Sequence, residues 1–145
     1  MEGRKGLSDR RDTLYIDVPV RVRYADTDRM GVVYYGAYPI YFEIGRTEYM
    51  RQRGFSYRAL EEEGYFLVVV GMEVKYYSPA TYDDLIIVQT GIVDVKSRAV
   101  RFHYRIQKDG TLLVEGKTDH VCTNRDKKAT LIPPTLLTIL KDGAV

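Results

Sequence analysis

Two carboxylates lie close together in a loop between a predicted strand and a predicted helix. Asp26 and Asp28 are separated by one residue, and Gly31 follows them. The first amides of a helix lack partners inside the helix, so those near Tyr35 and Gly36 point out of its end. Such amides stabilise an oxyanion or a polarised carbonyl. A carboxylate beside them is sufficient for acyl transfer from a good leaving group such as a thiolate.

A structural interpretation of the same aspartates stays open. Aspartate side chains often hydrogen-bond their own backbone in turns, which would make Asp26 and Asp28 turn formers only. A calcium loop is excluded, because that motif needs Asp or Asn at its fifth position and Glu at its twelfth. This chain has Met30 and Ala37 at those two positions.

The basic segment Lys96-Ser97-Arg98 lies at a predicted turn between two strands. A basic turn is commonly a solvated hairpin. Two cations beside free turn amides also suit a nucleotide or a pyrophosphate, so a phosphate clamp is the alternative.

The side chains that could form a soft metal site are few. They are His103, His120 and Cys122, and strand alternation places His103 on the opposite face from the other two. We therefore expect no metal site.

Glu48 falls on the apolar side of the predicted helix, and we expect it to pair with an arginine, because buried charges are usually paired.

Hydrophobic periodicity predicts the elements that must position these residues. Apolar residues at every even position of Leu14–Tyr24 indicate a half-buried strand, with Pro19 favouring a sheet edge. A helix is predicted from about Gly36 to Arg53, and its wide apolar surface indicates that protein surrounds it. Ser56–Glu63 predicts a short second helix. Apolar runs at 65–76 and 85–95 predict two more strands.

The charge pattern predicts the register of the last two strands. Asp109-Gly110 marks a tight hairpin. Pairing Lys108 with Leu112 through a three-residue loop keeps the two faces of the hairpin unmixed. The charged pairs that then face each other are Arg101 with Asp119 and Arg105 with Glu115. The fold class is therefore α+β, with an antiparallel five- to six-stranded sheet wrapped around one long central helix.

Composition places the chain among single-domain globular proteins. It has 145 residues, and we expect a flexible tail at 1–12 and one domain over 13–145. A net charge of +2 gives no general case for nucleic acid. One cysteine, Cys122, fits a reducing compartment, and no apolar run is long enough to span a membrane. We expect a soluble cytoplasmic protein.

Several segments together resemble a known family. They are the D-x-D-x-x-G-x-V-x-Y block from Asp26 to Tyr35, helix segment Glu43–Glu48, and Tyr77–Leu85. The chain over about Val18 to Thr123 is similar to the hotdog-fold thioesterases. The resemblance is to their 4-hydroxybenzoyl-CoA thioesterase-like branch, which includes the small acyl-CoA thioesterases associated with the bacterial Tol-Pal system.

The resemblance implies roles for the loop and the helix start. Asp28 matches the catalytic carboxylate, acting as nucleophile or as base for water. The Tyr35 backbone N–H matches the donor that polarises the thioester carbonyl, and the Gly36 N–H is the second expected donor. Many Tol-Pal-associated members carry His where this chain has Tyr35, which leaves the acyl preference open.

The resemblance also implies how the substrate is held. The expected CoA-binding residues are Lys96, Ser97 and Arg98. The expected acyl pocket is aromatic, with walls from Tyr34, Tyr38 and Phe42, and suits short-chain or aromatic acyl groups. No cofactor is expected beyond the CoA of the substrate itself.

Family members are dimers, often tetramers built as dimers of dimers, with active sites at the interface. A homo-oligomer, such as a homotetramer, is therefore expected here. The second hypothesis is a non-catalytic acyl-CoA or acyl-carrier-protein binding module on the same fold. A hotdog dehydratase is disfavoured, because the long helix and its approach carry no His.

Overall fold

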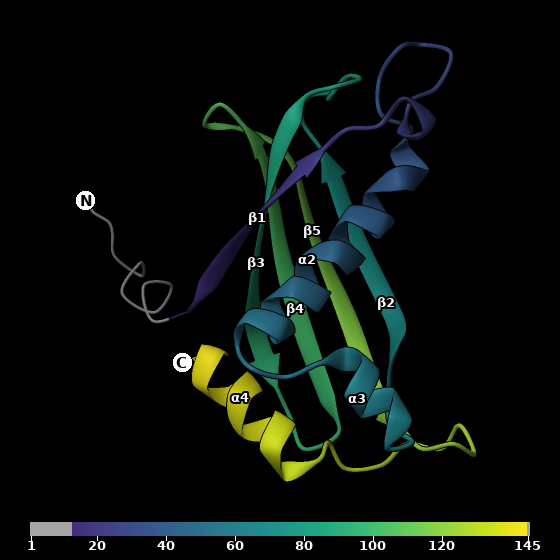
Figure 1. Ribbon diagram of the computed structural model, residues 1–145, viewed down its shortest axis with the longest axis vertical. Helices are drawn as coiled ribbons and strands as arrows, with labels where there is room; N and C mark the ends of the chain where they lie inside the picture. The colour runs from purple at the N-terminus through teal and green to yellow at the C-terminus, as the bar shows by residue number, and fades with distance from the viewer. Residues whose placement is uncertain (1–12, 145) are drawn as a thin grey trace.

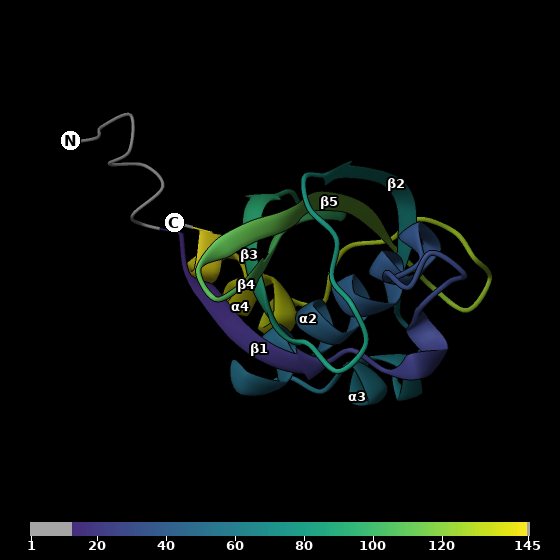
Figure 2. The same cartoon turned by 90° about the horizontal axis from the view of Figure 1, so that it is seen from above.

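One antiparallel sheet of five strands curves around a central helix in the computed structural model, which describes residues 13–144 (Figure 1). The predicted tail, residues 1–12, lies outside the described residues. The strands lie in the order β1-β3-β4-β5-β2. Their bounds are β1 (Tyr15–Arg21), β2 (Phe66–Tyr76), β3 (Leu85–Val95), β4 (Ala99–Lys108) and β5 (Thr111–Thr123). The expected α+β class, a sheet wrapped around one helix, is confirmed (Figure 2).

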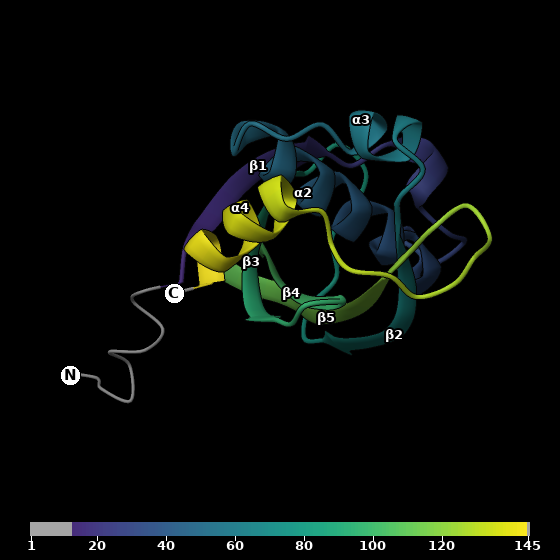
Figure 3. The same ribbon diagram turned by 90° about the horizontal axis from the view of Figure 1, so that it is seen from below.

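The helices are α2 (Tyr38–Gln52), α3 (Tyr57–Glu62) and α4 (Pro134–Ala144), and α4 lies beyond the lower end of α2 (Figure 3). A 3-10 turn, η2 (Tyr35–Ala37), leads into α2, so the regular helix begins slightly later than predicted. Pro39 lies in its first turn, where a missing N–H costs little. None of the helices in residues 13–144 is long and apolar enough to cross a membrane.

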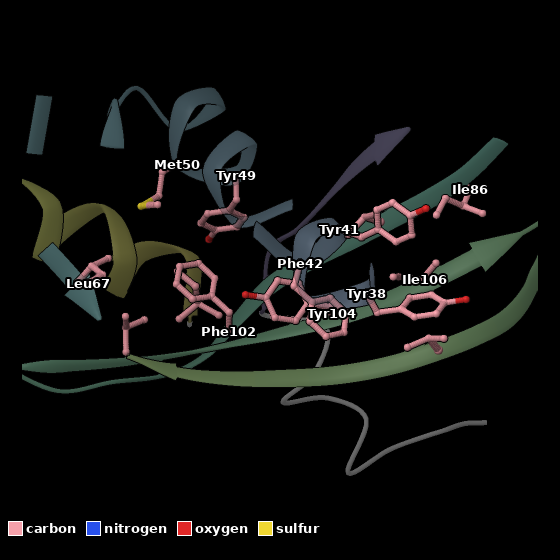
Figure 4. Close-up of a cluster of buried hydrophobic side chains, with 14 of the residues drawn as sticks. Tyr38, Tyr41, Phe42, Tyr49, Met50, Leu67, Ile86, Phe102, Tyr104 and Ile106 are labelled. Atoms are coloured by element: carbon pink, nitrogen blue, oxygen red, sulfur yellow. The ribbon is translucent and has the colours of Figure 1, made fainter. Parts of the chain in front are cut away.

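Aromatic packing and one close backbone approach seat α2 on the sheet. The ring of Phe42 stacks on that of Tyr104, with centroids 4.4 Å apart (Figure 4). Gly45 lies directly over Val88 and Thr90 of β3, and a Cβ there would collide with both side chains. The absence of a side chain at position 45 therefore lets the helix approach the sheet closely.

The predicted register of β4 and β5 holds for most of their length. Arg101 faces Asp119 and Arg105 faces Glu115, as the charge pattern indicated. The hairpin end was predicted wrongly, because Lys108 pairs with Thr111 rather than with Leu112. Asp109 and Gly110 both have positive φ, 50° and 81°, so they form a two-residue turn that matches the strand twist. An irregularity after Ile106 absorbs the one-residue difference.

The sheet has two ends that matter for the site. At one end, the Val22 N–H donates to the Asp84 carbonyl oxygen at 2.8 Å, and Val32 bridges to Thr81. The loop that carries Asp28 therefore lies at the Leu85 end of β3. At the other end, the Ile132 N–H donates to the Ser97 carbonyl oxygen at 2.9 Å, beside α4.

The edge position predicted for β1 is confirmed.

Candidate active site

Asp28 lies in a tight, hydrogen-bonded turn between β1 and α2. Its N–H donates to the Val32 carbonyl oxygen, and its own carbonyl oxygen accepts from the Gly31 N–H, both at 2.9 Å. The Met30 N–H donates to Asp28 Oδ1 at 2.8 Å. The side chain is exposed, and Oδ2 has no hydrogen-bond partner within residues 13–144. Asp28 is therefore a turn former that also presents one free carboxylate oxygen.

Asp26 has a different role, because it anchors this loop. Its carboxylate is buried and accepts hydrogen bonds from Arg23 Nη2 at 2.8 Å and from the Tyr41 hydroxyl at 2.9 Å. Burial by itself would raise the pKa of Asp26, but the hydrogen bonds from Arg23 and Tyr41 outweigh it and hold that pKa below its ordinary value. A charged Asp26 thus ties the loop to α2. The sequence pattern did not separate this role from that of Asp28.

The start of the helix presents free donors, as the sequence predicted. The Tyr34 N–H is taken by the Asp26 carbonyl oxygen, and the Ala37 N–H by the Tyr34 carbonyl oxygen, both at 2.8 Å. Within the described part of the chain, the amides of Tyr35 and Gly36 have no hydrogen-bond acceptor. The Tyr34 ring covers the space where a Gly36 side chain would stand. Two backbone donors are therefore available beside the Asp28 loop.

A hollow of about 360 Å³ opens between this loop and the end of β2. It is lined by Asp28, Val32, Val33, Tyr35, Tyr38, Tyr76, Tyr77, Ser78 and Pro79. The Tyr76 hydroxyl donates to the Tyr35 carbonyl oxygen at 3.0 Å, which links β2 to the helix start. The hollow thus brings a carboxylate, a helix terminus and tyrosine rings together.

The predicted acyl-pocket residues are placed differently from one another. Tyr38 lines the hollow, and Tyr34 lies next to it with its ring 4.6 Å from that of Tyr35. Phe42 is fully buried against Tyr104 and does not line the hollow of a single chain. Tyr76 and Tyr77 do line it, and sequence reasoning gave them no role. Their place at the end of β2, beside the segment Tyr77–Leu85, was the available signal.

The basic turn Lys96-Ser97-Arg98 lies far from Asp28 within one chain. It follows the last residue of β3, whereas the Asp28 loop contacts Thr81, a few residues before the first (Figure 1). β3 is eleven residues long, which is roughly 35 Å in an extended strand. All three residues are exposed. One chain therefore does not bring the turn and the carboxylate together.

The two histidines lie on opposite faces of the sheet. His103 hydrogen-bonds Glu115 on the outer face, whereas His120 contacts Thr118 beneath α2. Residues 13–144 hold no group of three His, Cys, Asp or Glu side chains placed to bind one metal ion. Glu48 pairs with Arg51, which confirms an arginine partner, although both side chains are partly exposed rather than buried.

A sheet thus curves around one helix, and a carboxylate with a free oxygen and the free helix-start amides lie at one end of it. The chain belongs to the Thioesterase-like superfamily, whose family model matches residues 22–140. This confirms the family expected from the sequence.

Individual relatives agree with this assignment. "Acyl-CoA thioester hydrolase YbgC" of Escherichia coli O157:H7 is 39% identical over 85% of this chain and 93% of its own length. A DHNA-CoA thioesterase from Staphylococcus aureus is similar in structure, with a TM-score of 0.85 and 29% identity over 88% of this chain and 89% of that one. A hypothetical protein from Thermus thermophilus has a TM-score of 0.84 and 34% identity over 86% and 96% of the two chains.

Proposed function

We propose that this protein is an enzyme that hydrolyses an acyl-CoA thioester to a free acid and CoA. The observation that carries the proposal is the hollow lined both by Asp28, whose Oδ2 is free, and by Tyr35, whose amide is unpaired. The names of the relatives, an acyl-CoA thioester hydrolase and a DHNA-CoA thioesterase, support the same substrate class.

The proposed mechanism uses few groups. The thioester carbonyl oxygen accepts a hydrogen bond from the Tyr35 N–H, and the Gly36 N–H is a second donor. Asp28 then either attacks the carbonyl carbon, forming an anhydride that water opens, or removes a proton from an attacking water. The C–S bond breaks, oxygen from water enters the acid, and a proton reaches the CoA thiolate. This reaction needs no cofactor.

The proposed acyl subsite is aromatic. Tyr35, Tyr38, Tyr76 and Tyr77 supply flat rings around the hollow. Tyrosine combines a large apolar surface with a hydrogen-bonding tip, which suits aromatic or short acyl groups. Tyr34 contacts the ring of Tyr35 beside the hollow, whereas Phe42 packs against Tyr104 in the core.

The proposed CoA site needs a second copy of the chain. Lys96, Ser97 and Arg98 would hold the nucleotide and phosphates, but β3 separates them from Asp28 of their own chain. A homo-oligomer, a dimer or a dimer-of-dimers tetramer, would place the turn of one copy beside the hollow of another.

The proposed compartment is the cytoplasm, which the buried free thiol of Cys122 supports.

The test is thiol release from a panel of short aliphatic and aromatic acyl-CoAs. Asp28→Asn keeps an oxygen that accepts from the Met30 N–H, so the turn should persist while kcat falls by at least about 100-fold. Asp17→Asn, an exposed aspartate of β1, is the matched control and should leave kcat unchanged. Full turnover in Asp28→Asn would refute the mechanism. Tight CoA-ester binding without any turnover would favour the binding-module alternative. Activity with carrier-protein thioesters alone would show that the acyl group of the substrate is carried by a carrier protein and not by CoA.

A further inference from the structure

A second cavity, of about 250 Å³, lies between α2, α3 and the strands β2 and β5. It shares no lining residue with the hollow at Asp28. Its walls are Glu43, Arg46, Thr47, Met50, Tyr57, Glu61, Leu67 and His120. This volume is slightly below the range of typical drug-sized ligand sites, so it suits a small molecule.

A directed chain of hydrogen bonds forms the floor of this cavity. Arg46 Nη1 donates to the Tyr104 hydroxyl at 3.4 Å, and the Tyr104 and Thr118 hydroxyls lie 2.6 Å apart. Thr118 Oγ1 lies 2.8 Å from His120 Nε2, and His120 Nδ1 lies 3.3 Å from the Leu67 carbonyl oxygen. The Leu67 carbonyl oxygen only accepts, so His120 Nδ1 donates to it. In a neutral imidazole Nε2 then accepts from the Thr118 hydroxyl, which in turn accepts from the Tyr104 hydroxyl.

His120 adds no positive charge to the floor at neutral pH. It is 1% exposed, and burial together with the nearby charge of Arg46 lowers its pKa to about 4. The imidazole therefore stays neutral, and its neutrality sets the hydrogen-bond directions along the chain. Arg46 is the only cationic side chain among the lining residues.

Arg46 lacks the partner that a half-buried guanidinium normally has. Among residues 13–144, no carboxylate lies within ion-pair distance of it, and its one hydrogen bond, to Tyr104, is long. Charged groups inside proteins are usually paired, and a guanidinium binds carboxylates through two parallel N–H donors. Arg46 therefore has donors free for an anion that enters the cavity.

The remaining walls restrict which anion fits. Met50 and Leu67 are the aliphatic side chains of the lining but are only 2% and 7% exposed, and the Thr47 hydroxyl lies one residue from Arg46. Glu43 and Glu61 are exposed at the rim, where solvent screens them, but they would oppose an anion of high charge. A single carboxylate satisfies this condition, whereas phosphate carries more charge.

We propose that this cavity binds a small organic monocarboxylate, with its carboxylate on Arg46. The site is separate from the Asp28 hollow, and the proposal does not depend on thioester hydrolysis.

The test is a titration of the full chain with benzoate, followed by amide chemical shifts in two-dimensional NMR. Millimolar benzoate should shift the amides of Thr47, Tyr57 and Leu67 in a saturable way. Benzamide, which has the ring without the charge, and inorganic phosphate, which carries more charge, should bind at least about tenfold more weakly.

Matched variants make the result specific. Arg46→Gln should weaken benzoate binding at least about tenfold, and Arg46→Lys, which keeps the charge without the planar fork, should give an intermediate loss. Arg58→Gln, on the exposed face of α3, and Asp28→Asn should bind as the parent does. Melting temperatures confirm that each variant is folded. Three results would each overturn the proposal. They are unchanged benzoate binding in both Arg46 variants, chemical-shift changes confined to Val32 and Tyr76 of the other hollow, and no binding of benzoate at all.

Discussion

The Tyr41 hydroxyl donates a hydrogen bond of 2.9 Å to Oδ2 of Asp26, and this contact joins the central helix to the loop that carries Asp28. Both side chains are buried, with exposures of 2% and 6%. Asp28 follows Asp26 by two residues, and the Asp26 carbonyl oxygen accepts from the Tyr34 N–H at the helix start. The carboxylate and the amide donors are thus held by one shared anchor.

Removing this hydroxyl should damage activity as well as stability. Tyr41→Phe leaves the buried Asp26 carboxylate with Arg23 alone, and losing a hydrogen bond to a charged group costs about 1.5–3 kcal/mol of unfolding free energy. The loosened loop should lower kcat with the acyl-CoA substrate. Denaturant unfolding and steady-state kinetics measure the two effects. Tyr49→Phe, on the same helix but away from the loop, should lower stability and keep kcat; an equal loss of kcat in both variants would contradict the anchoring role.

The CoA clamp proposed at the far end of β3 predicts a split between substrates. Arg98→Ala should raise KM for acyl-CoA roughly tenfold, the effect of losing one charge-assisted hydrogen bond. The same variant should leave KM unchanged for a truncated thioester that lacks the nucleotide. Arg105→Ala, an exposed arginine in the middle of the outer face, is the control. Equal changes with both substrates would remove Arg98 from the site.

The close approach of Gly45 to β3 predicts a large loss from one added methyl group. In Gly45→Ala the new Cβ would overlap Thr90 and Val88, and overpacking of this kind costs about 1–3 kcal/mol. Thr90 Oγ1 is buried and has no hydrogen-bond partner in residues 13–144, so Thr90→Ala removes an obstacle without breaking a hydrogen bond. The double variant should recover part of the lost stability. A double-mutant cycle from denaturant unfolding measures this coupling, and strict additivity would argue against the contact.

His120 predicts how stability depends on pH. Its pKa in the folded protein is about 4, below the ordinary 6.5, because burial and then the charge of Arg46 disfavour protonation. As pH falls below 6.5 the unfolded chain binds the proton first, so stability present above 6.5 is lost progressively down to about pH 4. The full difference corresponds to roughly 3 kcal/mol.

The measurement is the unfolding free energy of parent and His120→Gln between pH 7 and 4.5. The variant should be less stable at pH 7 but should lose less stability on acidification. His103, whose pKa is also lowered by burial, contributes equally to both proteins. Parallel pH profiles would show that His120 does not carry this dependence.

Local patterns in the sequence determined much of this protein. The alternation in Leu14–Tyr24 and Pro19 gave an edge strand, and opposite charges gave the pairing of Arg101 with Asp119. The loop motif and the helix start indicated that Asp28 and Tyr35 belong to one site, and both line the same hollow. These features depend on neighbours in the chain or on directly facing strand positions. There, residue type alone predicts the local conformation or the strand pairing.

Tertiary structure alone decided the rest. Lys96–Arg98 and Asp28 lie at opposite ends of β3, which is an extended strand. The local sequence of β3 does not predict which of its ends the Asp28 loop will contact. The same packing buried Phe42 against Tyr104 instead of in the hollow. It also joined Arg46 to His120 across a helix and two strands. Such relationships depend on how distant elements pack, and periodicity records only which side of an element is apolar.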